Sequence, residues 1–222
     1  GGVAALLVTG LLIWLLGGDE GVPESNQSPA EPPDAKPAQV SKIDLDDPKT
    51  FNKIAAKAIK SGTRSGKGKN SNLQTRIEKG EELLYRKNQP KPYTGWTKEV
   101  WLGNSKGQIR RLTQYKGGKK DGPAIYLQRN GQKWTEHTYK DGKLDGLFTR
   151  WYEHLGQKSS EGNYKGGKLM SVVAWKPNGE RCPVTNIVDG NGVWVSYEHA
   201  GHKGGKHPYR RWTYREGKRV DD

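Results

Sequence analysis

Apolar residues follow three different spacings along this chain. Residues 3–16 form an almost unbroken apolar run, and residues 51–59 place apolar side chains at helical spacing. Further along, short runs such as 147–153 and 157–164 are strand-sized and mix aromatic with polar residues. Side chains repeat every 3.6 residues in a helix and every two in a strand. The pattern therefore predicts one apolar helix, one short amphipathic helix and a series of strands.

Residues 1–18 carry no charge and predict a membrane anchor. A spanning helix needs about 20 apolar residues, and this run is at that limit. No A-x-A cleavage pattern follows it, so an uncleaved transmembrane anchor is favoured over a cleaved signal segment. Positive charge marks the cytoplasmic side of a membrane, whereas the flank here is acidic, with Asp19, Glu20 and Glu24. We expect a membrane-anchored protein whose following domain is extracytoplasmic, in the bacterial cell envelope.

The stretch after the anchor predicts a linker. Residues 19–43 are rich in Pro, Glu, Ser, Asp and Gln. Such a composition cannot bury enough apolar surface to become ordered, so we expect a disordered tether.

A short amphipathic helix is expected within residues 44–62. Asp47 is suited to cap it, Pro48 to begin it and Gly62 to end it. We expect the helix to span residues 48–61 and to dock on the following sheet; contact of its lysine side with the membrane is the alternative. Residues 63–92 then read as a basic loop and a leading strand.

A repeated motif decides the expected fold of residues 93–222. The sequence Tyr, basic residue, any residue, Gly, Lys begins at positions 115, 139, 164 and 214, which are 24, 25 and 50 residues apart. A second feature recurs between these copies, as in "YLQRNGQK" and "YEHLGQK". Repetition at such a period indicates a repeat architecture. Since one hairpin does not stabilise itself, we expect a mainly β fold: an antiparallel meander of stacked β-hairpin repeats.

Glycines mark the expected turns between these strands. The motif glycines stand where the chain must reverse, at Gly118, Gly142, Gly167 and Gly217. The pairs Asn130-Gly131 and Asn178-Gly179 predict type I′ turns, which need positive φ at both central residues. The tyrosine of each motif therefore ends one strand, and its lysine begins the next.

The repeat resembles a known family at this level of detail. The clearest copy comprises Gly146, Trp151, Tyr152, Gly156, Gln157, Lys158, Glu161, Gly162, Tyr164, Lys165, Gly167 and Lys168. It is similar to the MORN-type repeat variant named after the YwqK antitoxin component. The resemblance covers about residues 93–222, with "RCPVTNIVDGNGVW" (181–194) interrupting the period. It implies a MORN-like hairpin repeat fold and an antitoxin-like protein-binding role.

Composition and charge narrow the choice of partners. Only 32% of the 222 residues are hydrophobic, and 8 Trp and 10 Tyr supply most of the large apolar area, which favours a thin aromatic core on sheets. Residues 1–50 hold 8 acidic and 3 basic residues, giving −5, whereas residues 51–222 hold 16 and 35, giving +19. Such a basic domain attracts polyanions.

Cys182 is the only cysteine, so no internal disulfide forms.

No convergent set of acid, base and nucleophile emerges from the sequence, so we predict that the protein is not an enzyme. His199, His202 and His207 form a local cluster without nearby cysteine, and we expect no metal there. Residues 61–70 depart from the P-loop spacing. We therefore expect no nucleotide and no cofactor.

Two functions remain. The first is a membrane-tethered, non-enzymatic scaffold that engages a partner protein through its β-hairpin surface, as an antitoxin-like or immunity-like module would. The alternative is a basic polyanion-binding domain for anionic lipid, envelope glycan or nucleic acid without sequence specificity. The residues expected to contact the partner are Lys119, Lys143, Trp151, Tyr152 and Lys168.

Overall fold

The computed structural model describes residues 44–63, 72–105, 107–153, 155–197 and 208–220. All of these described residues belong to one compact unit. The anchor and linker predicted at residues 1–43 lie outside the described residues. Within the described ranges, no helix has the length and apolar character needed to cross a membrane.

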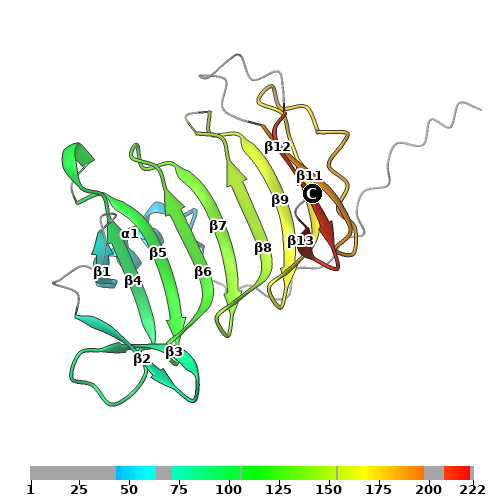
Figure 1. Ribbon diagram of the computed structural model, residues 1–222. Coiled ribbons are helices and arrows are strands. Elements are labelled where there is room, and N and C mark those ends of the chain that lie inside the picture. Colours follow the sequence, from blue (N-terminus) through cyan, green and yellow to red (C-terminus); the bar gives the residue numbers. More distant parts are fainter. Residues whose placement is uncertain (1–43, 64–71, 106, 154, 198–207, 221–222) are drawn as a thin grey trace, which may run out of the picture. The chain divides into compact units, whose positions relative to one another are not determined.

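An eight-stranded sheet forms the centre of the fold (Figure 1). Its strands, in spatial order, are β1 (Ile59–Thr63), β4 (Gly95–Val100), β5 (Ile109–Lys116), β6 (Lys119–Leu127), β7 (Lys133–Lys140), β8 (Lys143–Trp151), β9 (Lys158–Lys165) and β10 (Lys168–Ala174). From β4 to β10 each strand pairs antiparallel with the next along the chain. The predicted mainly β fold with an antiparallel meander is therefore confirmed.

The remaining elements lie before and after this meander. They are α1 (Pro48–Lys57), the hairpin of β2 (Leu73–Glu78) and β3 (Glu81–Arg86), a 3₁₀ helix (Gly103–Ser105), and a three-stranded sheet of β11 (Gly192–Tyr197), β12 (Pro208–Arg215) and β13 (Lys218–Val220).

The helix begins where it was predicted but ends earlier. The Asp47 carboxylate accepts hydrogen bonds from the backbone N–H groups of Lys49 and Thr50, at 3.2 and 2.8 Å, as an N-cap does. The end predicted at residue 61 is wrong, because Ala58 is already extended and Ile59–Thr63 pairs parallel with β4. Pairing of this segment satisfies backbone N–H and C=O groups at the edge of β4 that a longer helix would leave without a strand partner, so tertiary contact overrides local propensity.

The helix docks on one face of the sheet, as expected. Phe51 and Ile54 pack with Leu45 against Ile125 and Leu127. The Lys98 ammonium also donates a 2.7 Å hydrogen bond to the Ala55 carbonyl oxygen in the last helical turn. Burial of this apolar stripe therefore holds α1 in place.

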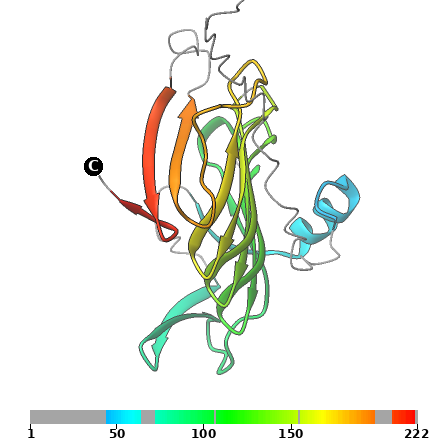
Figure 2. The same ribbon diagram turned by 90° about the vertical axis from the view of Figure 1, so that its right-hand side faces the viewer.

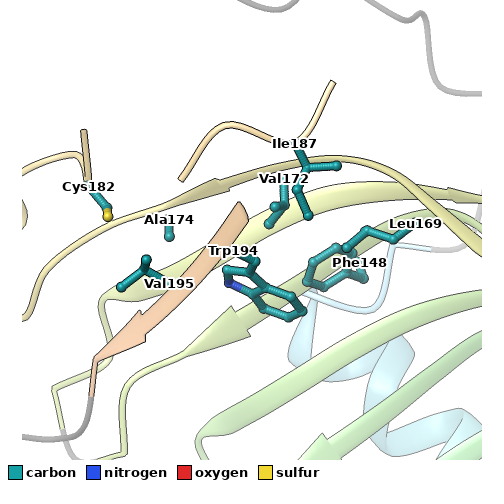
Figure 3. Close-up of a cluster of buried hydrophobic side chains, with 8 residues drawn as sticks. All are labelled: Phe148, Leu169, Val172, Ala174, Cys182, Ile187, Trp194 and Val195. Atoms are coloured by element: carbon teal, nitrogen blue, oxygen red, sulfur yellow. The ribbon is translucent and has the colours of Figure 1, made fainter. Parts of the chain in front are cut away.

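The meander does not continue to residue 222. After β10 the chain leaves the large sheet, and β11–β13 form a separate sheet that packs on the face opposite to α1 (Figure 2). Phe148, Leu169, Val172, Ala174, Cys182, Ile187, Trp194 and Val195 fill the layer between the two sheets (Figure 3). The interrupting stretch at residues 181–194 supplies Cys182, Ile187 and Trp194. The interruption therefore builds a second layer instead of a further repeat.

The turns fall where the motif predicts them. Positive φ occurs at both central residues of the motif turns, for example 49° at Asp141 with 84° at Gly142, and 57° at Gly166 with 87° at Gly167. These are the dihedral signs of type I′ turns. The type I′ prediction for the two Asn-Gly pairs is wrong, because Gly131 and Gly179 have positive φ while Asn130 and Asn178 do not.

Successive repeats are linked through their turns. The Asp145 carboxylate accepts a 2.9 Å hydrogen bond from the Gly166 backbone N–H, one turn further along the chain. Asp121 does the same for the Asp141 backbone N–H, at 3.2 Å. Each motif tyrosine lies opposite a glycine of the neighbouring strand, as Tyr164 does opposite Gly146. The aspartate and the glycine that follow a motif, such as Asp145 and Gly146, therefore contact the motif of the next repeat.

We expect the Asp145→Ala substitution to lower the free energy of unfolding by about 1 kcal/mol, since the N–H of Gly166 loses its acceptor. Asp145→Asn keeps a side-chain oxygen at the same place and should lose clearly less. Urea unfolding of both variants measures the difference. Equal losses would show that the carboxylate charge, and not the hydrogen bond, is what matters.

Candidate functional site

The five residues predicted to contact a partner do not form one site. Lys119, Lys143 and Lys168 each begin a strand, directly after a motif turn. Trp151 ends β8, and Tyr152 follows it. Since Lys143 and Trp151 are eight residues apart on one strand at about 3.3 Å per residue, they are separated by about 26 Å. The lysines and the aromatic pair thus lie at opposite ends of the strands.

The lysines form a row that we call the lysine edge. It comprises Lys116, Lys119, Lys140, Lys143, Lys165 and Lys168, which flank three successive two-residue turns. Lys119 is paired with Glu81 at 2.7 Å. Lys143 and Lys168 are exposed and have no ion pair with any described residue. Neighbouring turns are two strands apart, about 10 Å, so the row presents regularly spaced positive charge.

Trp151 and Tyr152 are poor contact residues by comparison. Tyr152 is 3% exposed, and its hydroxyl donates a hydrogen bond to the Trp175 carbonyl oxygen. Trp151 is half-buried, with the Lys133 ammonium 5.6 Å from the centroid of its ring. Tyr152 therefore belongs to the core, and only part of Trp151 is open to a partner.

Sheet register gathers a different group of residues, the arginine–aromatic face. Arg111 of β5 pairs with Tyr126 of β6, and Tyr126 pairs with Thr135 of β7. Thr135 in turn pairs with Arg150 of β8. Paired residues share a face, as do residues two apart on one strand, so His137 and Tyr139 of β7 lie on the same face. We define the arginine–aromatic face as Arg111, Tyr126, His137, Tyr139 and Arg150.

Ring contacts continue from this face into the core between the sheets. The ring centroid of His137 lies 5.9 Å from that of Tyr126 and 6.2 Å from that of Phe148. Phe148 in turn lies 5.6 Å from Trp194 of β11. We call this row of rings the aromatic strip: Tyr126, Tyr139, His137, Phe148 and Trp194. The second sheet buries its Phe148 end, whereas Tyr126, His137 and Tyr139 remain partly exposed. At this end of the strip, the described residues leave aromatic surface partly open.

Positive charge exceeds negative charge on the arginine–aromatic face. Arg111 is ion-paired with Glu99, which also holds Arg110 at 2.7 Å. The Arg150 guanidinium is partly buried and has no hydrogen bond or ion pair with a described residue. Burial, together with the nearby positive charge of Arg210, lowers the pKa of Arg150. An arginine remains charged even so, and Arg150 therefore presents an uncompensated cation.

Hydroxyl groups around these cations stay protonated. Burial raises the pKa of Tyr139 to about 12, and does the same for Tyr164. The Lys120 ammonium lies 4.9 Å from the centroid of the Tyr139 ring. Neutral phenols donate hydrogen bonds, so the surroundings of Arg150 combine donors with positive charge. That is the chemistry of an anion-binding surface.

His137 is held neutral within this surface. Burial, with smaller contributions from Arg150 and Lys120, lowers the pKa of His137 from 6.5 to about 4. Its Nδ1 atom is buried and has no hydrogen-bond partner. The imidazole therefore acts as an aromatic packing group at neutral pH, since protonation would place a third cation beside two others.

The lowered pKa predicts a loss of stability in acid. The unfolded chain takes up a proton near pH 6.5 and the folded chain only near pH 4, so the contribution of neutral His137 is complete above pH 6.5 and is lost as the pH falls towards 4. The limiting slope is about 1.4 kcal/mol per pH unit, reduced here because the ring is partly exposed. His137→Phe should flatten this dependence in urea unfolding at a series of pH values. An unchanged slope between pH 6.5 and 4 would contradict the assignment.

The described residues contain no group of three or more His, Cys, Asp or Glu side chains that could hold a metal ion. The histidines at 199, 202 and 207 lie outside the described residues. On the arginine–aromatic face, an imidazole stands beside cations, and the neighbouring carboxylate, Glu99, is engaged by two arginines. The arrangement suits recognition of an anion better than proton transfer.

The arginine–aromatic face was missed by sequence reasoning, although a signal for part of it exists. Counting back from a motif tyrosine in steps of two places Arg111 on the face of Tyr115, and His137 on the face of Tyr139. Arg150 carries no such marker, because it becomes part of the site only through its strand pairing with Thr135.

Comparisons with protein-family models, with curated proteins and with solved structures found no match to this chain.

Proposed function

We propose that the chain is a non-enzymatic binding module, tethered to a membrane by residues 1–18, that engages an acidic segment of a partner protein on the arginine–aromatic face. The observation that carries this proposal is Arg150, a partly buried guanidinium without a counter-charge among the described residues. Removing a charge from water is costly unless it is paired. A carboxylate from a partner would offset that cost, and it matches the guanidinium fork in a bidentate arrangement.

The composition of the face supports a protein partner. Tyr, Trp and Arg are the residues that most often carry binding energy in protein interfaces. Tyr126 and Tyr139 present partly exposed rings on either side of His137. Such rings bury apolar area at a small cost in side-chain entropy, while Arg111 and Arg150 select an acidic partner.

The resemblance to the YwqK-type repeats is consistent with an antitoxin-like or immunity-like partner, and the uncharged run at residues 1–18 with a location in the bacterial cell envelope. Fractionation of cells expressing the natural protein tests the tether. Recovery of all the protein in the soluble fraction, with its amino terminus intact, would remove this part of the proposal.

A matched peptide pair tests the binding face. One peptide alternates Glu with Phe, and the other replaces every Glu by Gln. We expect the full chain in detergent to bind the Glu peptide at least about tenfold more tightly, a difference of about 1.4 kcal/mol. Arg150→Met should remove this preference, and Lys143→Met should retain it. Equal binding of both peptides, or an equal loss in both variants, would refute the face as the acidic-partner site.

The lysine edge favours a second function, the binding of polyanions. Its lysines flank successive turns about 10 Å apart, and residues 51–222 carry a net charge of +19. Anionic lipid headgroups, envelope glycans and nucleic acid all offer repeated negative charge to such a row. Polyanion binding would use exposed ammonium groups on flexible side chains, whereas binding of an acidic partner segment would use partly buried, planar guanidinium groups.

A further inference from the structure

A cavity of about 310 Å³ opens at the end of the strands opposite to the lysine edge. It is lined chiefly by Trp101, Arg110, Tyr126, Arg129, Trp134 and Glu153. Its volume lies at the lower end of the roughly 300–1,000 Å³ found for small-molecule sites. The cavity is therefore sized for one ring and its substituents.

Three connections between strands build this cavity. Trp101 directly follows β4, Arg129 lies in the turn between β6 and β7, and Glu153 lies in the loop between β8 and β9. The β6–β7 turn is closed by a 2.8 Å hydrogen bond from the Gln128 N–H to the Gln132 carbonyl oxygen. Backbone hydrogen bonds also close the other two connections, from the Trp101 N–H to the Gln108 carbonyl oxygen and from the Tyr152 N–H to the Gln157 carbonyl oxygen.

Arg129 is held in position and remains available to a ligand. Its guanidinium carbon lies 4.9 Å from the centroid of the Trp101 ring, and that of Arg110 lies 5.4 Å from the same centroid. Arg110 is already paired with Glu99 at 2.7 Å. Arg129 has no ion pair with a described residue. Stacking on the indole therefore pre-organises one uncommitted cation at the cavity.

Trp134 and Glu153 give the cavity an apolar wall and an acceptor. Trp134 is 45% exposed, which is unusual for so large an apolar side chain, because such residues are mostly buried. The Glu153 carboxylate can accept several hydrogen bonds, and the Tyr126 hydroxyl can donate or accept. The lining thus offers a stacking surface, a cation and acceptors for hydroxyl groups within one small cavity.

We propose that this cavity binds a sugar ring carrying a single carboxylate, as in a uronic acid. The C–H face of a pyranose packs on the Trp134 indole, the carboxylate pairs with Arg129, and hydroxyls donate to Glu153. Glu153 repels a phosphate dianion more strongly than a carboxylate, because the dianion carries about twice the negative charge. The inference does not rest on the partner-binding role of the arginine–aromatic face.

Three ligands test this assignment on the full chain in detergent: methyl glucuronoside, methyl glucoside, which lacks only the carboxylate, and uridine monophosphate. Tryptophan fluorescence or ligand-observed NMR reports binding. We expect saturable binding of the glucuronoside, with the glucoside at least about tenfold weaker, or about 1.4 kcal/mol. Uridine monophosphate should bind more weakly than the glucuronoside.

Two variants locate the site, and a third serves as control. Arg129→Met should bring the glucuronoside down to the level of the glucoside, while Trp134→Ala should weaken both by about tenfold. Both side chains are exposed, so the fold should persist, and circular dichroism checks this. Lys91→Met, an exposed lysine outside the cavity, should bind as the natural protein does. No saturation by the glucuronoside up to about 10 mM, tighter binding of the nucleotide, or natural affinity in both cavity variants would overturn the proposal.

Discussion

Alanine at position 217 should destabilise the protein far more than alanine at position 167, although both glycines occupy the same place in the repeat motif. Both have positive φ, 73° and 87°, which costs an L-residue roughly 1–2 kcal/mol. A Cβ atom on residue 167 would meet nothing within 4 Å, whereas one on residue 217 would lie 2.6 Å from the Lys168 Cβ. The Leu169 N–H also donates a 2.9 Å hydrogen bond to the Gly217 carbonyl oxygen.

We therefore expect Gly167→Ala to cost about 1 kcal/mol and Gly217→Ala about 3 kcal/mol, since overpacking adds roughly 1–3 kcal/mol to the φ penalty. Urea unfolding of the two variants gives both values under one condition. Lys168→Ala serves as the control, because an exposed lysine at a turn usually contributes little. Equal losses of unfolding free energy in the two glycine variants would contradict the close contact between the β12–β13 turn and β10.

The comparison between these two glycines also shows why the fold was only partly predictable. The local requirement of the motif, a tight turn with positive φ at two residues, is written in the residues themselves, and the structure confirms it at Gly142 and Gly167. The motif copy at Tyr214 has the same local form. The motif itself does not indicate whether its hairpin extends the large sheet or covers one face of it. That depends on the packing of Trp194 and the other apolar residues of 181–194 against the large sheet.

The end of α1 was also mispredicted because a tertiary contact decides it. Ile59 continues the apolar spacing of the helix, so the pattern extends to residue 61, but Ile59–Thr63 instead pairs with the edge of β4. A short pairing that joins segments almost forty residues apart in the chain leaves no periodic signal in the local sequence. Tertiary pairing decided the boundary, while the cap at Asp47, which is purely local, was predicted correctly.

The candidate site followed from the strand pairing more than from residue type. The lysines were predicted to contact a partner because they repeat with the motif. Lysine is well tolerated at exposed turns, so its repetition there does not by itself indicate a binding site. Arg150 does not repeat, and it enters the candidate site because it borders the aromatic strip, whose other end the second sheet covers. The departure of β11–β13 from the meander thus leaves one half of the aromatic strip buried and the other half partly exposed.

Two charge variants should separate the candidate functions. The first reverses Lys119, Lys143 and Lys168 to Glu, and the second replaces Arg111 and Arg150 by Met. If the lysine edge binds polyanions, the first variant should lose most of its affinity for duplex DNA and for anionic vesicles, while the second keeps it. The log–log salt slope of duplex binding should become shallower by about two to three units, since each contact contributes about 0.9.

Binding of the Glu-containing peptide should respond in the opposite way. Contacts to partly buried guanidinium and aromatic groups depend on shape and fade less with salt, so the Arg111 and Arg150 variant should lose at least about tenfold in affinity. The lysine variant should lose little beyond the general change in net charge, and repeating the titration at high salt removes that contribution. Trp151 and Tyr152 are unsuitable for this comparison, because Tyr152 is buried and its truncation would unfold the core. If reversing the three lysines leaves polyanion binding intact, the lysine edge serves solubility alone; if replacing the two arginines leaves peptide binding intact, the uncompensated charge of Arg150 is not the recognition site.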